Sequence, residues 1–230
     1  MVVLFHKFTD IERHSTTSKF QFSFALKYCF GLFFTTALMT LAVEAIKYNN
    51  YYAHPYGVIE EETIMFFMNA FFVPLFWLIN PFQLIKLIKR KFNYGKRSLT
   101  QGEAHKLMEN SEYDIGKRYA EIIETMWFTF LYSTLVPFGA FISMIGIGIY
   151  YWVDKYNLLR RSSFSSQVQG KLVFTSMNLL DFTLALNMIG SLMFDRQIRE
   201  EHFTSTIVML SIAVVYLFCP KKWIFEKVYP

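Results

Sequence analysis

The sequence has few of the residues from which enzyme active sites and metal sites are usually built. It holds two cysteines, Cys29 and Cys219, which are far apart and give neither a zinc-ligand spacing nor a disulfide framework. Its five histidines fall in segments that we predict to be loops or termini, and none of them pairs at metal-ligand spacing. The nucleophile, zinc-protease, phosphate-loop and CxxC motifs are all missing. We therefore predict that the protein is not an enzyme.

Charged residues are scarce as well. They make up 18% of the chain, against about 25% in a typical soluble domain. The net charge of +5 comes without a basic patch interleaved with aromatic residues, so we expect no nucleic-acid partner. Hydrophobic residues reach 53% and gather in long blocks with almost no charge inside them. This pattern indicates a multi-pass integral membrane protein, in either a plasma or an organelle membrane.

The longest apolar stretch, from Tyr119 to Val153, is too long for one membrane crossing. After Glu121 and Glu124 it holds no charge until Asp154. As one helix it would be roughly 50 Å long, whereas a bilayer core is about 30 Å thick. Pro137 and Gly139 interrupt its middle, and proline disfavours a helical conformation in the residue before it. We predict a tight helical hairpin at residues 119–153; the alternative is a single kinked and tilted helix.

Together with the other apolar blocks, this hairpin predicts an all-α bundle of six transmembrane helices. Their approximate bounds are 22–46, 63–88, 119–136, 138–153, 172–194 and 203–218. Nineteen of the 23 Lys and Arg residues then lie on one side of the membrane, three lie on the other and Lys27 lies within a span. A five-span model gives the weaker split of 14 against 8. Because basic residues concentrate in cytoplasmic loops, residues 1–21 and the tail 219–230 are expected on the cytoplasmic side.

Three polar residues at membrane depth are candidate functional residues: Asn69 in the second span, and Asn178 and Asp181 in the fifth. A carboxylate in the middle of a span costs a few kcal/mol, so Asp181 is expected to face protein or water. Asn178 lies three residues before it, which places both on one face of a continuous helix. The alternative role for Asn178 is helix–helix packing through its amide.

Glu121, Glu124 and Asp154 are a second set of candidates, at the cytoplasmic end of the hairpin. Glu121 lies 16 residues before Pro137 and Asp154 lies 17 after it. At about 1.5 Å per residue both are roughly 25 Å from the turn, and thus at matching depth. Two carboxylates so placed repel each other unless a cation separates them. We favour a protein cation, Arg118 or Lys155, over a bound metal ion; a solvated first helical turn and an interfacial Asp154–Lys155 pair are simpler alternatives.

Aromatic and glycine residues complete the pattern. Trp127, Trp152 and Trp223 are expected in the belts where tryptophan meets the membrane surface. Gly146 and Gly148 predict close helix packing, with a flexible hinge as the alternative.

Several short stretches in this chain carry a resemblance to a known family. They are Ile11–Phe20 (IERHSTTSKF), Arg118-Tyr119, Tyr132-Ser133, Pro137 and Tyr151–Leu159 (YWVDKYNLL). In these features the chain resembles the C-terminal membrane region of the OSCA/CSC-type hyperosmolality-gated calcium-permeable channels, within the wider anoctamin-like superfamily. The similarity follows the order of that family's last six spans.

The resemblance implies a cation channel that opens under osmotic or mechanical force, or a lipid scramblase. It also implies a Ca²⁺ site, in which Glu121 and Asp154 correspond to acidic ligands, while Arg118 and Tyr150 stand where the family pattern has acids. The family has further spans and a cytosolic domain before this region, so the resemblance implies that the chain corresponds to a C-terminal half: a fragment, a split subunit, or a relic recruited as structure.

Two functions are therefore expected as alternatives. The first is a calcium-permeable, mechanosensitive channel of this type, or part of one. The second is a non-conducting structural subunit of a larger membrane complex. Either has the lipid bilayer, with bound lipids, as a partner, together with other membrane subunits or further copies of the chain.

Overall fold

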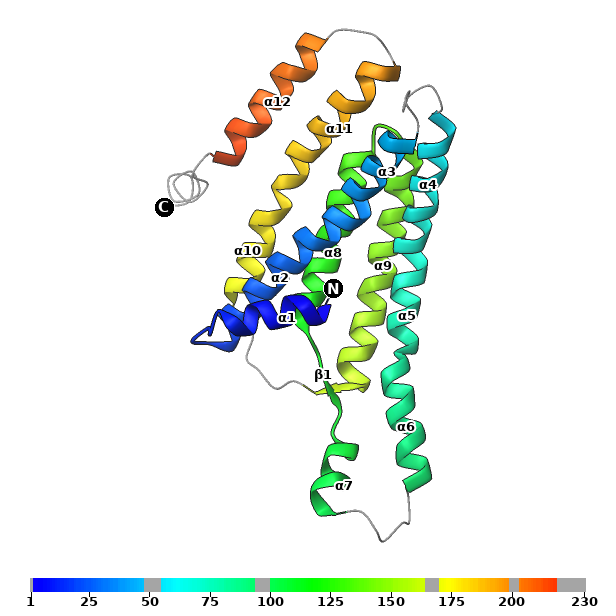
Figure 1. Cartoon of the computed structure of the whole chain (residues 1–230), viewed down its shortest axis with the longest axis vertical. Coiled ribbons are helices and arrows are strands. Elements are labelled where there is room, and N and C mark those ends of the chain that lie inside the picture. The colour runs from blue at the N-terminus through cyan, green and yellow to red at the C-terminus, as the bar shows by residue number, and fades with distance from the viewer. Residues whose placement is uncertain (1, 48–54, 94–99, 164–169, 199–202, 219–230) are drawn as a thin grey trace.

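The computed structural model describes residues 2–47, 55–93, 100–163, 170–198 and 203–218 (Figure 1). Within these ranges the chain is all-α, with eight helical segments, two of which are interrupted at Asn80 and at Asp181, and one two-residue parallel bridge between β1 and β2. The elements are α1 (Val2–Ile11), α2 (Thr17–Phe33), η1 (Phe34–Leu38), α3 (Met39–Lys47), α4 (Pro55–Phe67), η2 (Met68–Phe72), α5 (Val73–Ile79), α6 (Pro81–Asn93), α7 (Gln101–Met108), β1 (Ser111–Glu112), α8 (Ile115–Tyr132), α9 (Pro137–Arg160), β2 (Ser162–Ser163), α10 (Gly170–Leu180), α11 (Phe182–Ile198) and α12 (Phe203–Phe218).

Three helical segments are long and apolar enough to cross a membrane: Lys19–Val43, Ile59–Phe92 and Ser176–Phe194. They coincide with the predicted spans 22–46, 63–88 and 172–194. Thr206–Leu217, in the predicted span 203–218, is apolar but shorter. The remaining two predicted spans are the hairpin helices α8 and α9, and neither is among the three segments that are long and apolar enough to cross a membrane.

The stretch 119–153 forms two helices joined by a short turn, and not a single kinked helix. The amides of Leu135 and Val136 donate to the Tyr132 carbonyl at 3.0 and 2.9 Å, which closes α8. Pro137 then begins α9, where its missing N–H leaves no helical bond unmade. The bounds of these helices differ by several residues from the approximate spans predicted, 119–136 and 138–153. α8 begins at Ile115, because the Asp114 side chain accepts a hydrogen bond from the Lys117 amide, and α9 continues to Arg160.

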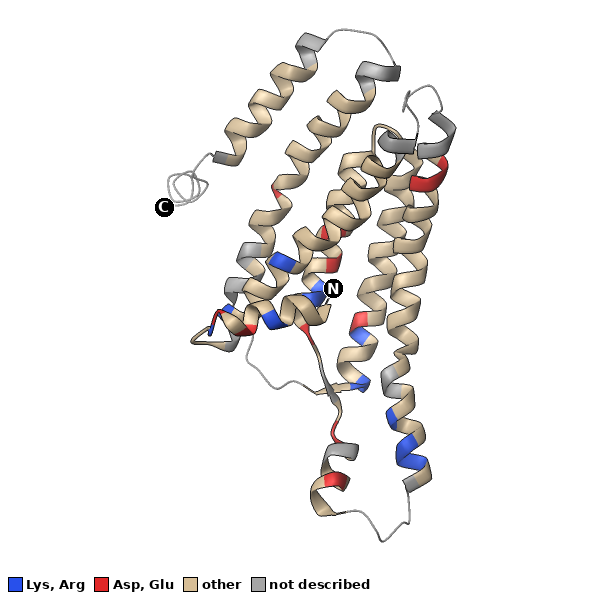
Figure 2. Ribbon diagram, in the orientation of Figure 1, with Lys and Arg blue, Asp and Glu red and all other residues tan. Residues whose placement is uncertain are grey.

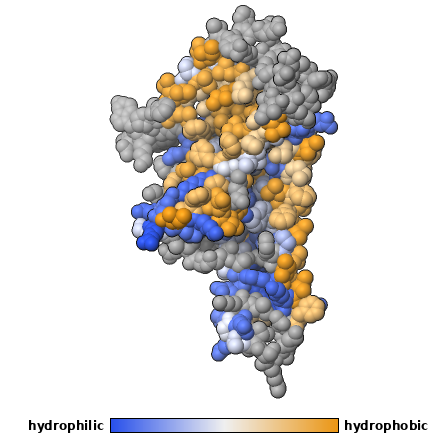
Figure 3. All heavy atoms as spheres, viewed as in Figure 1, coloured by the Kyte–Doolittle hydropathy of each residue, from blue (hydrophilic) through white to orange (hydrophobic). Residues whose placement is uncertain are grey.

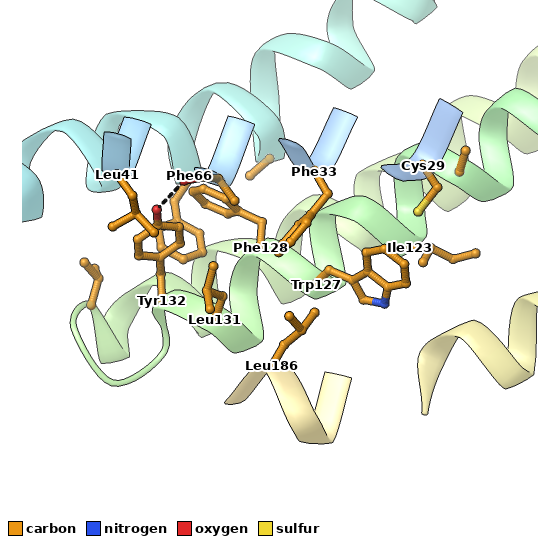
Figure 4. Packing of buried hydrophobic residues seen from close by; sticks show 14 of the residues in the cluster. Cys29, Phe33, Leu41, Phe66, Ile123, Trp127, Phe128, Leu131, Tyr132 and Leu186 are labelled. Carbon is orange, nitrogen blue, oxygen red and sulfur yellow. Dashed lines mark hydrogen bonds between the residues drawn. The ribbon is translucent and has the colours of Figure 1, made fainter. Parts of the chain in front are cut away.

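α8 is the central helix of the bundle, with twelve of its eighteen residues buried. It packs against α2, α9 and α11, while α9 packs against η2 and α5 on its other side. Figure 4 shows Trp127, Phe128 and Tyr132 of α8 among side chains from the neighbouring helices. The placement predicted for Trp127 in a membrane-surface belt was wrong. It is 1% exposed, and its indole N–H donates to the Leu179 carbonyl at 3.0 Å.

Two breaks in the long helices differ from the continuous spans expected from hydropathy. Asn80 adopts a left-handed conformation, with φ of 42°, between α5 and α6. Asp181 separates α10 from α11, so Asn178 and Asp181 are not on one uninterrupted helix as the i, i+3 spacing assumed. The carbonyl of Leu180, at this break, accepts a hydrogen bond from the Thr183 hydroxyl at 2.6 Å.

Candidate functional site

The cytoplasmic end predicted for the hairpin contains a buried three-residue ion cluster. Arg118 Nη1 lies 2.8 Å from Glu121 Oε2, one helical turn along α8, and Arg118 Nη2 lies 2.8 Å from Asp154 Oδ1 on α9. The side chains of Arg118, Glu121 and Asp154 are 6%, 9% and 18% exposed. Only the Glu121 contact has hydrogen-bond angles; the Asp154 contact is a close ion pair. We call these residues the hairpin ion cluster.

Aromatic side chains lie against the cation of the cluster. The Arg118 guanidinium lies 4.1 Å from the centre of the Trp77 ring, and the Lys117 ammonium lies 4.3 Å from the same ring. Tyr150 lies on the α9 side, 5.9 Å from Arg118. Burial, with the Asp154 charge second, raises the pKa of Tyr113, which keeps this phenol neutral. A cation stacked on aromatic faces is attracted by the ring quadrupole, so these rings add to the ion pairs in holding Arg118.

Glu124 lies one helical turn beyond Glu121 and contacts a different helix. Its carboxyl Oε1 is 2.6 Å from the Thr36 hydroxyl of η1, and the residue is 5% exposed. The same hydroxyl is 2.9 Å from the Leu32 carbonyl. A hydroxyl has one proton, so it donates either to Leu32 or to Glu124. Glu124 is thus a buried carboxyl with a neutral partner, unlike Glu121 with its arginine.

Glu62 is a buried acid that the sequence did not single out. It follows Glu60 and Glu61 in an acidic run, which resembles a solvated loop, but the structure places it within α4 at 1% exposed. The hydroxyls of Tyr132 and Thr40 lie near its carboxyl group. Its Oε2 has no hydrogen-bond partner among the described residues. The only signal for its burial was its position one residue before the apolar block.

The other predicted residues lie outside the hairpin ion cluster. Asn69 is half-buried in η2, with its side-chain nitrogen unpaired within the described part of the chain. Asn178 is exposed and Asp181 is half-buried at the α10–α11 break. Asn187 of α11 instead accepts a hydrogen bond from Ser133 at 2.9 Å. The structure therefore brings Glu121 and Asp154 together and leaves Asn69, Asn178 and Asp181 apart from them.

The residues of the hairpin ion cluster do not fit a Ca²⁺ ion in this arrangement. Ca²⁺ takes six to eight oxygen ligands, whereas the Arg118 guanidinium already lies between the two carboxylates. Tyr150 contributes a ring face to Arg118 and no carboxylate. Among the described residues, no group of three or more His, Cys, Asp or Glu side chains is placed to hold a metal.

Comparisons with protein-family models, with curated proteins and with solved structures gave no match. The resemblance of Tyr151–Leu159 to the OSCA/CSC-type channels is therefore a hypothesis that stands on the sequence features alone.

Proposed function

We propose that the chain is a six-span membrane protein that conducts cations, similar to the C-terminal half of the OSCA/CSC-type channels. The observation that carries this proposal is a series of buried carboxyl groups along α8. Glu121 lies beside Arg118, Glu124 beside Thr36, and Glu62 beside Tyr132 at the far end of the helix. Buried carboxyls at membrane depth are costly and commonly line ion pathways.

The spacing of these groups suits a path along α8. Eleven residues separate Glu121 from Tyr132, or about 16 Å along the helix axis, which is half of a bilayer core. Hydroxyl groups lie between them: Thr36 contacts Glu124, and Tyr132 donates to the Ala37 carbonyl at 2.8 Å. The carboxyls are buried in packed surroundings, so we assign this arrangement to a closed state.

The six-span topology is part of the same proposal. α9 has 24 residues, about 36 Å, which is sufficient to cross a bilayer, and α8 with 18 residues spans about 27 Å. The Lys and Arg residues of α6, the start of α8 and the end of α9 gather toward one end of the bundle (Figure 2). This is the asymmetry expected of a cytoplasmic side.

Sidedness of single cysteines tests the topology. In a chain with Cys29 and Cys219 replaced by alanine, Ser111→Cys and Ser163→Cys should react with an impermeant thiol reagent from the same side. Glu60→Cys, an exposed position in α4 on the other side of the predicted second span, should react from the opposite side of the membrane. Opposite sidedness at 111 and 163 would reject the hairpin as two crossings.

A non-conducting structural subunit is the second candidate, and the hairpin ion cluster favours it. Arg118 neutralises Glu121 and Asp154 within the protein, as a structural ion pair does. Purified chain in liposomes separates the two candidates. Cation flux or lipid flipping supports the first. Silence, together with tight co-purification of unrelated membrane subunits, supports the second.

A further inference from the structure

α6 is a two-faced helix with an unusual exposed stripe. Its sequence, PFQLIKLIKRKFN, contains four basic residues and no acid. Leu84, Ile85, Ile88 and Phe92 fall within about 100° of the helix circumference. Lys86, Lys89 and Arg90 fall on the other side, and Lys91 lies at the edge of the stripe. The four apolar side chains are 41%, 50%, 54% and 75% exposed.

Within the described residues, the most extensive contact of α6 with another element is the one with α7. That contact uses the basic face, where Arg90 Nη2 donates to the carbonyls of Met108 and Glu109 at 3.0 and 3.2 Å. The apolar stripe lies elsewhere on the helix. Figure 1 shows α6 extending beyond the end of the bundle, and Figure 3 shows hydrophobic surface along its outer side.

α6 begins where the membrane is expected to end. The part of the candidate span Ile59–Phe92 that precedes Asn80 ends at Ile79 and has about 21 residues, or about 31 Å, close to one bilayer core of about 30 Å. The next residues are Asn80, with its left-handed backbone, and Pro81, which cannot donate a helical hydrogen bond. The whole segment Ile59–Phe92 is therefore too long to be one crossing, and α6 is the part that continues beyond the length needed to cross the bilayer.

The carbonyl groups at the C-terminal end of α5 accept hydrogen bonds from donors outside α6. The Trp77 carbonyl accepts a hydrogen bond from Asn157 Nδ2 at 3.2 Å, and the Leu78 carbonyl accepts one from Arg161, both from the C-terminal end of α9. The Phe76 carbonyl accepts from the Asn80 amide at 2.9 Å. α6 has its own first bond, from the Leu84 amide to the Asn80 carbonyl at 3.1 Å. Rotation at Asn80 can therefore change the direction of α6 without breaking the end of α5.

We propose that α6 binds the anionic phospholipid surface on the cytoplasmic side of the membrane. Its apolar stripe enters the boundary between headgroups and acyl chains, and its Lys and Arg residues contact lipid phosphates and carboxylates. A helix with these two faces and no acidic residue is complementary to such a surface. Salt screens this attraction, so the binding should weaken as ionic strength rises. The proposal rests on the membrane topology proposed above, but not on conduction.

An environment-sensitive fluorophore on α6 tests the inference in the full chain. In the Cys29→Ala, Cys219→Ala background, the label is attached at Ile88→Cys, on the stripe, or at Lys89→Cys, one residue on and exposed on the basic face. The chain is reconstituted in phosphatidylcholine vesicles with or without phosphatidylserine. We expect the label at position 88 to shift to shorter wavelength and to be quenched by spin-labelled lipid when phosphatidylserine is present. The label at position 89 should stay in water.

A charge variant gives the matched control. Lys86→Gln/Lys89→Gln/Lys91→Gln leaves the Arg90 contact with α7 intact and should abolish the phosphatidylserine dependence at position 88. Lys7→Gln/Lys19→Gln removes two exposed lysines from α1 and α2 and should leave it unchanged. Equal signals in neutral and anionic vesicles, or a water-exposed label at 88 in both, would overturn the proposal. Correct sidedness at 60, 111 and 163 in the same preparation would confine that failure to α6.

Discussion

Replacement of Gly146 by alanine tests how closely α9 packs against η2. A Cβ atom at Gly146 would lie 2.6 Å from the Ala70 Cα and 2.8 Å from the Ala70 Cβ. Carbon atoms in contact are normally about 3.5–4.0 Å apart, so the two helices would have to separate by roughly 1 Å. Overpacking of this kind costs about 1–3 kcal/mol. A Cβ atom at Gly148, two residues away on the same helix, would meet no described atom within 4 Å, so Gly148→Ala should gain about 0.5–1 kcal/mol from helix propensity.

The unfolding free energies of the two variants should therefore lie on opposite sides of the parent value and differ by about 1.5–4 kcal/mol. The measurement is the free energy of unfolding in detergent micelles by denaturant titration, with helical circular dichroism as the signal. Gly190→Ala extends the series, because its Cβ would lie 2.0 Å from the Leu131 carbonyl oxygen. Equal stability of Gly146→Ala and Gly148→Ala would show that α9 does not pack on η2 in this way.

Three further predictions concern charged groups. Arg118→Gln leaves Glu121 and Asp154 buried without a cation and should destabilise the chain by about 3–5 kcal/mol. Lys155→Gln removes an exposed cation and should lower the free energy of unfolding far less. Equal losses of stability in the two variants would contradict the hairpin ion cluster. Because Arg118 separates these carboxylates, Glu121→Gln should lower the melting temperature equally with and without calcium, and a calcium-dependent rise lost in both Glu121→Gln and Asp154→Asn would reverse this conclusion. The Lys27 ammonium, with Ser23 and His14, lowers the pKa of Glu12 from 4.5 to about 2. This contact therefore stabilises the fold above about pH 4.5, and the stabilisation is lost as pH falls toward 2. Glu12→Gln should remove that part of the pH dependence of unfolding, and an unchanged pH profile would contradict the prediction.

Length and hydropathy were sufficient to predict the long apolar helices and the hairpin. The 35 residues from Tyr119 to Val153 exceed one crossing, and Pro137 supplied the break where the structure begins α9. The same count of residues from Pro137 placed Glu121 and Asp154 at one depth, and the structure places Arg118 between them. These predictions succeeded because they depend on distance along a helix, which sequence number measures directly.

Features that depend on neighbouring helices were not predictable in this way. Glu62 looked like part of a solvated acidic run, and its burial depends on Tyr132, seventy residues later. Tryptophan is common at the membrane surface, but Trp127 lies in the core, where its indole N–H donates a hydrogen bond to the Leu179 carbonyl. Of the two glycines predicted to pack, Gly146 contacts Ala70 and Gly148 faces open space among the described residues, although their sequence surroundings are nearly the same.

The most direct test of the proposed function is cation flux through liposomes that contain the purified chain. The account predicts that an osmotic gradient or membrane tension opens a path for K⁺ or Ca²⁺ and that Glu124→Gln, which changes a buried carboxyl on this path, alters the flux. Glu109→Gln, an exposed acid outside the bundle, should leave it unchanged. A parent chain that is correctly inserted by the sidedness test but passes no cations under tension would contradict the central claim and leave the structural-subunit function in its place.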